Sequence, residues 1–225
     1  MATVTWTLAD IVKEIPIAAK VFQRHRLDFC CGGRQSLAQA CAATGADPAA
    51  VMREIESAAQ AASEAQDRDS IRWTDRPIPE LVQHILDRYH ATLRTEIPRL
   101  IELSRKVEER HADKPDRPAG LADLLTDVQA AVDSHLEKEE QILFPMIIAG
   151  HGQMAYMPIQ VMMMEHEDHG RNLRRIREIT RDLAVPEHAC ASWRELYRAL
   201  AEFEADLMYH IHLENNILFP RVLGS

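Results

Sequence analysis

The chain has 225 residues, of which 46% are hydrophobic and 27% are charged, and these proportions exclude wholesale disorder, a collagen-like repeat and a small disulfide scaffold. The 26 Lys and Arg against 35 Asp and Glu leave a net charge of -9, and no strongly basic block offsets it. Such a surface repels phosphate backbones and anionic lipid, so we expect neither nucleic acid nor a membrane as partner. Small molecules, metal cations and other proteins are better candidates.

The N-terminus and the cysteines favour a cytoplasmic protein. The first residues carry no basic flank, and charged side chains interrupt them before the core of a signal peptide can form. No apolar run approaches the ~18 residues that a membrane span needs. Two of the four cysteines are adjacent, at Cys30 and Cys31, which is not the pattern of a secreted disulfide framework. We therefore expect thiols or metal ligands in a reducing compartment.

The sequence predicts an all-α fold, because Gly is rare at 8 residues and long tracts are rich in Ala, Leu, Glu, Arg and Met. Asp47 and Pro48 form an N-cap followed by Pro at the first helical position. Helices are expected at about 8–14, 17–25, 37–43, 48–64, 79–111, 121–149, 157–183 and 193–222. The last four are typical of an antiparallel four-helix bundle. We accordingly divide the chain into a small helical domain (1–64), a polar linker (65–78) and the bundle (79–225).

The bundle region contains an internal repeat. Residues 135–145 read HLEKEEQILFP and residues 210–220 read HIHLENNILFP, which share the pattern H-x-x-x-E-x-x-I-L-F-P. The two histidines lie 75 residues apart, and a step of 76 residues back from His166 reaches His90. The repeat therefore predicts a fourth histidine in the first long helix. His84 is the competing position, but its helix face is more polar and its spacing does not fit the repeat.

The repeated residues are expected to face the bundle interior. A His and a Glu four residues apart share one face of a helix. His135 and Glu139 continue an apolar stripe that includes Val132 and Ile142, and the second copy has an equivalent stripe. Ionisable groups buried at such positions cost several kcal/mol unless they are paired or bind metal. Counted from the helix ends, the candidate ligands share one level of the bundle: His90, His135, Glu139, His166, His210 and Glu214.

Four His and two Glu are too many ligands for one tetrahedral zinc and suit two metal ions bridged by the carboxylates. Ligation by nitrogen and oxygen without thiolate favours iron or manganese, although the residue types do not exclude zinc. Bridging by Glu139 and Glu214 would leave each metal with room for a solvent-derived bridge and a small ligand. Which histidines share a metal stays open. His169 is a reserve ligand, and Glu165 is either a proton relay or a solvent-facing residue.

The adjacent thiols of Cys30 and Cys31 precede Gly32 and Gly33. Neighbouring cysteines in such a loop are badly placed for an unstrained disulfide, but they can present two thiolates to a metal or a redox partner. The alternative is a pair of half-buried small hydrophobic residues. The residue types alone do not decide between the two interpretations.

The sequence DFCCGG at 28–33, ahead of a hemerythrin-like bundle with two H-x-x-x-E-x-x-I-L-F-P copies, closely resembles the repair-of-iron-centres family of di-iron proteins. The resemblance implies a cytoplasmic non-haem protein with two iron ions, bridged by the two carboxylates and an oxo group at the six ligand positions. It implies a role in restoring iron-sulfur clusters damaged by nitric oxide or peroxide, so that damaged iron-sulfur proteins are its partners. It also implies reactivity toward nitric oxide, with reductase activity as an open question, and a role for Cys30 and Cys31 in iron or electron transfer.

Two other functions compete with repair. A hemerythrin-like module that binds or senses oxygen or nitric oxide would use the same six metal ligands. Such a module would give Cys30 and Cys31 no role. A ferritin-like oxidase fits less well, since such enzymes use more Glu and an E-x-x-H spacing. The oligomeric state stays open, with a homodimer as one candidate.

Overall fold

The computed structural model describes residues 3–65 and 71–224, and helices dominate it throughout. Between these described residues, the only strand-like pairing is an isolated bridge from Thr7 to Ser36. The prediction of an all-α fold is therefore confirmed. The α-helices are α1 (Leu8–Glu14), α2 (Ala18–Arg24), α3 (Leu37–Thr44), α4 (Pro48–Ala65), α5 (Ile78–His84), α6 (Ala91–Arg110), α7 (Leu121–Lys138), α8 (Phe144–Ile148), α9 (Tyr156–Ile179), α10 (Ala191–His212) and α11 (Phe219–Leu223).

In the described part of the chain, three π-helical turns interrupt the long helices. They are η3 (Ile85–His90), η4 (Glu139–Leu143) and η5 (Leu213–Leu218). A short 3₁₀ turn, η2 (Trp73–Asp75), lies in the segment predicted as a linker, of which residues 66–70 fall outside the described part of the chain.

Three of the N-terminal helices, α1, α3 and α4, begin at side-chain caps. Thr7 accepts a hydrogen bond from the Asp10 amide, and Ser36 and Gln39 form a reciprocal capping box at the start of α3. The Asp47 carboxylate accepts from the Ala49 amide, as expected of the predicted cap before Pro48. These helices bury a compact apolar core that includes Ile11, Phe22, Phe29, Leu37 and Ile55.

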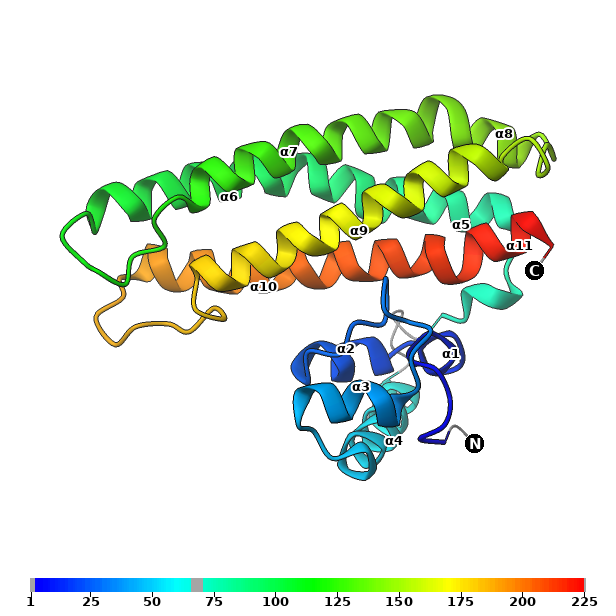
Figure 1. Cartoon of the computed structure of the whole chain (residues 1–225), viewed down its shortest axis with the longest axis horizontal. Helices are drawn as coiled ribbons and strands as arrows, with labels where there is room; N and C mark the ends of the chain where they lie inside the picture. Colours follow the sequence, from blue (N-terminus) through cyan, green and yellow to red (C-terminus); the bar gives the residue numbers. More distant parts are fainter. Residues whose placement is uncertain (1–2, 66–70, 225) are drawn as a thin grey trace. The chain divides into compact units, whose positions relative to one another are not determined.

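Figure 1 shows α6, α7, α9 and α10 as four long helices lying side by side. Each buries an apolar stripe with helical spacing, as α9 does with Ile159, Met162, Leu173 and Ile176. The described residues from Val82 to Leu207 form one compact unit, and those up to Leu81 join the segment from Met208 in a second unit. Among the helices described, none has both the length and the apolar character to cross a membrane.

Two of these π-helical turns, η4 and η5, lie where the repeated sequence ends in Pro. Pro145 has no amide hydrogen, and its ring would clash with the carbonyl four residues earlier in a regular helix. The Phe144 amide instead donates to the carbonyl of Glu139, five residues back, and the Phe219 amide donates in the same way to Glu214. Each turn therefore inserts one extra residue into its helix.

The inserted residue overturns one expectation from the sequence. Ile142, predicted to continue the buried stripe of α7, is 53% exposed, while Leu143 and Phe144 are buried. The prediction assumed an uninterrupted period of 3.6 residues. Because the π-helical turn η4 starts at Glu139, the side chains beyond it are rotated onto a different face.

Candidate metal centre

The six predicted ligands come together in the structure. His135, His166 and His210 lie on α7, α9 and α10, whereas the turns η3, η4 and η5 carry the other three. Every one of the six side chains is at most 2% exposed. An apolar interior makes six ionisable groups costly unless they neutralise one another or surround cations. The six are His90, His135, Glu139, His166, His210 and Glu214.

The ligand atoms form two overlapping groups of four. One contains His90 and His210, the other contains His135 and His166, and both contain Glu139 and Glu214. Within each group, one ligand atom per residue lies within 4.8 Å of the others. The sequence had left the pairing of histidines open, and this geometry pairs His90 with His210 and His135 with His166.

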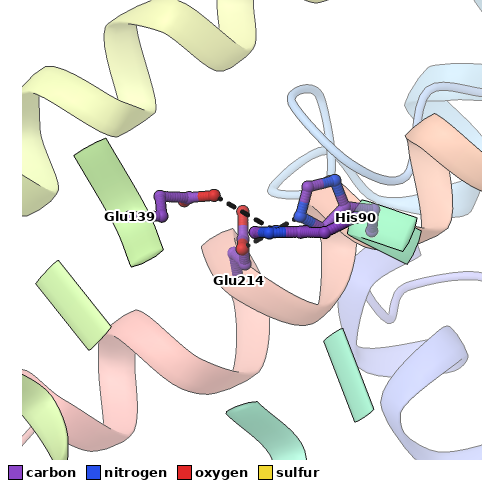
Figure 2. A group of neighbouring side chains, drawn as sticks. His90, Glu139 and Glu214 are labelled. Carbon is purple, nitrogen blue, oxygen red and sulfur yellow. Dashed lines mark hydrogen bonds and ion pairs between the residues drawn. The ribbon is translucent and has the colours of Figure 1, made fainter. Parts of the chain in front are cut away.

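Glu139 turns its two carboxylate oxygens toward different histidines. Its Oε2 lies 3.4 Å from His90 Nε2, and its Oε1 lies 3.4 Å from His135 Nε2. Figure 2 shows Glu139 and Glu214 directed toward the imidazole of His90. Glu214 Oε1 lies 3.0 Å from His210 Nε2, one helical turn away. A carboxylate that faces two imidazoles in this way has the disposition of a bridging ligand.

His135 and His166 approach each other through the same type of atom. Their Nε2 atoms are 3.1 Å apart. Two imidazole nitrogens that bind one cation at about 2.0–2.1 Å are separated by roughly 3–3.4 Å for angles between 90° and 110°. The separation therefore fits two nitrogens that converge on one ion.

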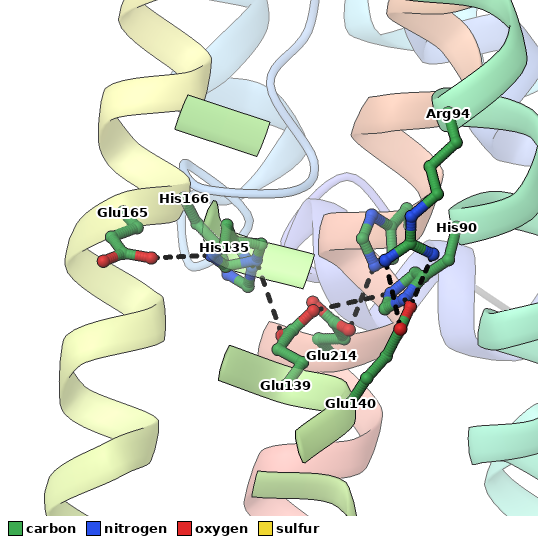
Figure 3. A network of polar contacts seen from close by, with 9 residues as sticks. His90, Arg94, His135, Glu139, Glu140, Glu165, His166 and Glu214 are labelled. Atoms are coloured by element: carbon green, nitrogen blue, oxygen red, sulfur yellow. Dashed lines mark hydrogen bonds and ion pairs between the residues drawn. The ribbon is translucent and has the colours of Figure 1, made fainter. Parts of the chain in front are cut away.

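Two outer carboxylates hold the opposite ring nitrogens (Figure 3). His90 Nδ1 lies 2.8 Å from Glu140 Oε1, and His135 Nδ1 lies 2.8 Å from Glu165 Oε2. Because an ionised carboxylate accepts and cannot donate, each Nδ1 must carry the proton. This arrangement leaves the lone pair on Nε2, the atom that faces the group of ligands.

Each outer carboxylate is itself held by a cation. Arg94 pairs with both oxygens of Glu140, at 2.7 and 3.0 Å, and Lys138 pairs with Glu165. Burial acts to raise the pKa of Glu140, but the hydrogen bonds from Arg94 and His90 outweigh it and lower the pKa below its ordinary value. Glu140 therefore stays ionised at neutral pH.

Sequence reasoning missed Glu140, Arg94 and Lys138. Arg94 follows His90 by four residues on the same helix face, and that spacing was an available signal. Glu140 directly follows a predicted ligand and gave no periodic signal of its own. Glu165, predicted as a relay or a solvent-facing residue, is 27% exposed at its side chain and contacts His135.

Seven of the 11 histidines lie outside both groups of four, and His84, His169 and His212 are among them. His169 is buried with its ring edge-on to that of His135, at a centroid distance of 4.9 Å. His84 packs edge-on against Tyr89. Burial lowers the pKa of His212 to about 3, so this imidazole is neutral at physiological pH.

The predicted cysteine loop holds a second kind of cluster. Asp28, Cys30 and Cys31 each offer one ligand atom within 4.8 Å of the others. Asp28 Oδ1 accepts hydrogen bonds from the amides of Cys30 and Cys31, at 3.1 and 2.9 Å. The neighbouring Cys31 thiol, burial and the charge of Asp28 together raise the pKa of Cys30 well above its ordinary value. All four cysteines are described, and none of them forms a disulfide.

A side chain from the C-terminal helix fixes this loop. Asn216 Nδ2 donates to the carbonyl oxygens of Phe29 and Cys30, at 3.2 and 3.3 Å. The ring of Phe29 packs edge-on against His212 at 5.7 Å. The loop is thus tied to the helical turn that also carries Glu214.

The comparisons with known proteins give the class to which this site belongs. A family model described as hemerythrin HHE cation binding domain matches residues 81–222, and the model ScdA_N, described as a domain of unknown function, matches residues 5–59. The chain therefore belongs to the hemerythrin HHE family, and it carries an ScdA_N domain ahead of the HHE domain.

Its relatives narrow this class. A probable iron-sulfur cluster repair protein from Haemophilus influenzae is 44% identical over 97% of this chain and 96% of its own length. The iron-sulfur cluster repair proteins YtfE from Pectobacterium atrosepticum and Citrobacter koseri are 42% and 44% identical, with 96% of each covered. The resemblance to the repair-of-iron-centres family, stated from DFCCGG and the repeated motif, is thereby confirmed.

Proposed function

We propose that this protein repairs iron-sulfur clusters damaged by nitrosative or oxidative stress, using two iron ions held by the six buried ligands. The observation that carries the proposal is the pair of overlapping four-residue groups that share Glu139 and Glu214. The names of relatives that align over nearly the whole chain support the repair role. We also propose that the protein acts in the cytoplasm and that damaged iron-sulfur proteins are its partners.

The donor set fits iron. Four imidazoles and two carboxylates provide nitrogen and oxygen ligands of the kind found in non-haem iron sites. Two carboxylates and two pairs of histidines would offer each ion two nitrogens and two oxygens. That number leaves open positions for an oxo bridge and a small ligand such as nitric oxide or oxygen. When bound, the iron ions supply redox chemistry and sites for such a ligand.

The protein's own residues orient this centre and control its protons. Glu140 and Glu165 keep the proton of His90 and His135 on Nδ1, so that Nε2 is available as a ligand. Glu165 is also partly exposed, which supports its proposed role as a proton relay between His135 and solvent. Cys30 and Cys31 would assist the transfer of iron or electrons.

Metal analysis tests the centre directly. We expect about two iron ions per chain in anaerobically purified protein and a loss of both in the double variant Glu139→Ala and Glu214→Ala. Full iron content in that variant would refute the assignment. Replacement of Cys30 and Cys31 by Ser should leave this iron content intact but abolish repair of a damaged cluster enzyme, and unchanged repair would refute the transfer role.

The second candidate function is a module that binds or senses oxygen or nitric oxide. The metal centre is expected to keep open coordination positions, and this expectation favours the second candidate. The binding of a small molecule such as oxygen needs no residues beyond the six side chains that would hold the metal ions. Reversible binding without recovery of a damaged cluster enzyme would support this candidate. Iron donation and nitric oxide reduction, the two routes to repair, are separated by measuring iron transfer to the client and formation of nitrous oxide.

A further inference from the structure

We propose that Asp28, Cys30 and Cys31 form a separate metal site that binds one thiophilic divalent cation. The identification of the natural cation as ferrous iron rests on the proposed function. The geometry of the site does not, because it concerns the three side chains alone. The site would explain how the two cysteines take part in iron transfer, because their thiolates would bind the cation.

The two sulfur atoms have the separation that a shared cation requires. Cys30 Sγ and Cys31 Sγ lie 3.7 Å apart. Two thiolates that bind a tetrahedral cation at about 2.3 Å are separated by roughly 3.8 Å. A disulfide would require about 2.05 Å, so the observed spacing is far from a covalent bond.

The carboxylate completes a set of three ligands. Asp28 Oδ1 lies 3.2 Å from Cys30 Sγ, and a tetrahedral cation that binds one sulfur and one oxygen would separate them by roughly 3.6 Å. A shift of a few tenths of an ångström, or the use of the other carboxylate oxygen, meets this distance. Two thiolates and one carboxylate carry one negative charge more than a divalent cation balances, so the complex would have a net charge of about -1.

The loop is held in this conformation before any ion binds. The amides of Cys30 and Cys31 both donate to Asp28, which fixes the carboxylate beside the thiols. The following glycines are required by close packing. A Cβ at Gly32 would lie 2.9 Å from the carbonyl oxygen of Asp28, and one at Gly33 would lie 2.6 Å from that of Phe29. The DFCCGG sequence thus supplies both the ligands and the small residues that let the loop close on them.

The site differs from the His and Glu centre in accessibility. Cys30 is buried, whereas Asp28 and Cys31 are half-buried, and three protein ligands leave a fourth position for solvent or another ligand. A cation held by three ligands at a partly exposed position exchanges more readily than one enclosed by fully buried side chains. Binding displaces the two thiol protons into solvent and changes no oxidation state. Ready exchange is the property that a site needs if it passes a cation on to another site.

Cobalt titration of the full-length, reduced protein tests the inference. Thiolate ligands give Co²⁺ an intense near-ultraviolet charge-transfer band, which ligation by His and Glu does not. We expect this band to saturate at one equivalent per chain. Replacement of Cys30 and Cys31 by Ser should abolish it, and Asp28→Asn, which keeps an acceptor for the loop amides, should weaken the affinity at least tenfold while the band persists.

The matched control replaces Cys41 and Cys190 by Ser, which should leave the band unchanged. Absence of the band in the wild-type protein, or its survival without Cys30 and Cys31, would overturn the site. An unchanged cobalt affinity in Asp28→Asn would show that the Asp28 carboxylate is not a ligand of the site. The variant Glu139→Ala with Glu214→Ala separates this inference from the proposed function, since it should lose the iron of the His and Glu centre and retain the cobalt–thiolate band.

Discussion

Replacement of Glu140 by Gln should weaken metal binding although Glu140 is not itself a predicted ligand. The carboxylate accepts the Nδ1 proton of His90 at 2.8 Å and is paired with Arg94. Gln can still accept one hydrogen bond, but it carries no charge. The imidazole then becomes a weaker donor to a cation at Nε2, and the ring is held less firmly.

The size of the effect follows from this geometry. Loss of a carboxylate that supports a metal-binding histidine reduces metal affinity by about 10–100-fold, or roughly 1.4–2.8 kcal/mol. The Glu140 side chain is 29% exposed, so solvent screens part of its charge. We therefore expect a loss near the lower end, about tenfold. Glu165→Gln should have a similar effect through His135.

The assay is a ferrous iron titration of the apo protein, under anaerobic conditions, in competition with a chelator of known affinity. Glu137→Gln is the matched control, because Glu137 is an exposed carboxylate at the end of α7, just before η4, and pairs with Gln141. Equal iron affinities for the Glu140 and Glu137 variants would refute the argument that the outer carboxylate tunes the histidine. Circular dichroism of the two apo proteins checks that the fold is retained.

Three further predictions concern stability. Gly33→Ala should destabilise the protein by about 1–3 kcal/mol in urea unfolding, because its Cβ would lie 2.6 Å from the Phe29 carbonyl oxygen; unchanged stability would show that the loop yields freely. Arg177→Met should cost about 1–3 kcal/mol, since Glu204 is 17% exposed and would lose its partner. Arg198→Met, at a 55% exposed side chain, should leave the free energy of unfolding nearly unchanged, because solvent screens its ion pairs. Equal losses in the two Arg variants would contradict this distinction. Chelation of the bound metal should lower the unfolding temperature reversibly, by an amount that grows with the affinity, and an unchanged temperature would mean that the buried ligands do not depend on a cation.

The sequence predicted which residues lie together, because the candidate ligands are part of a periodic pattern. His135 and His210 share a repeated motif, and the same spacing reached His90 from His166. A repeat and a helical period are both visible in one dimension, so they locate residues on a shared face and at a shared level. The start of α4 was predictable because the N-cap at Asp47 is a local signal.

The supporting residues were not predictable in this way. Glu140 contacts His90 on another helix, 50 positions away in the sequence. The hydrophobic periodicity of a single helix carries no information about such a contact. Asp28 lies in a loop without periodicity, although an Asp that precedes a turn by two residues commonly accepts from the backbone amide there. The exposure of Ile142 depended on the π-helical turn, which a regular helical period cannot represent.

The repeated motif has a structural consequence that its ligands alone do not suggest. In both copies the Phe before the Pro donates its amide to the carbonyl of the candidate ligand Glu, five residues back. The residue that supplies a carboxylate therefore lies within the π-helical turn, as the first residue of η4 and the second of η5. Glu139 and Glu214 are thereby placed by the same device in two helices that are far apart in sequence. Each carboxylate belongs to both groups of four ligands, whereas each histidine belongs to one. The pattern H-x-x-x-E-x-x-I-L-F-P therefore places one shared and one unshared candidate ligand per copy, and the two copies supply both carboxylates that the two groups have in common.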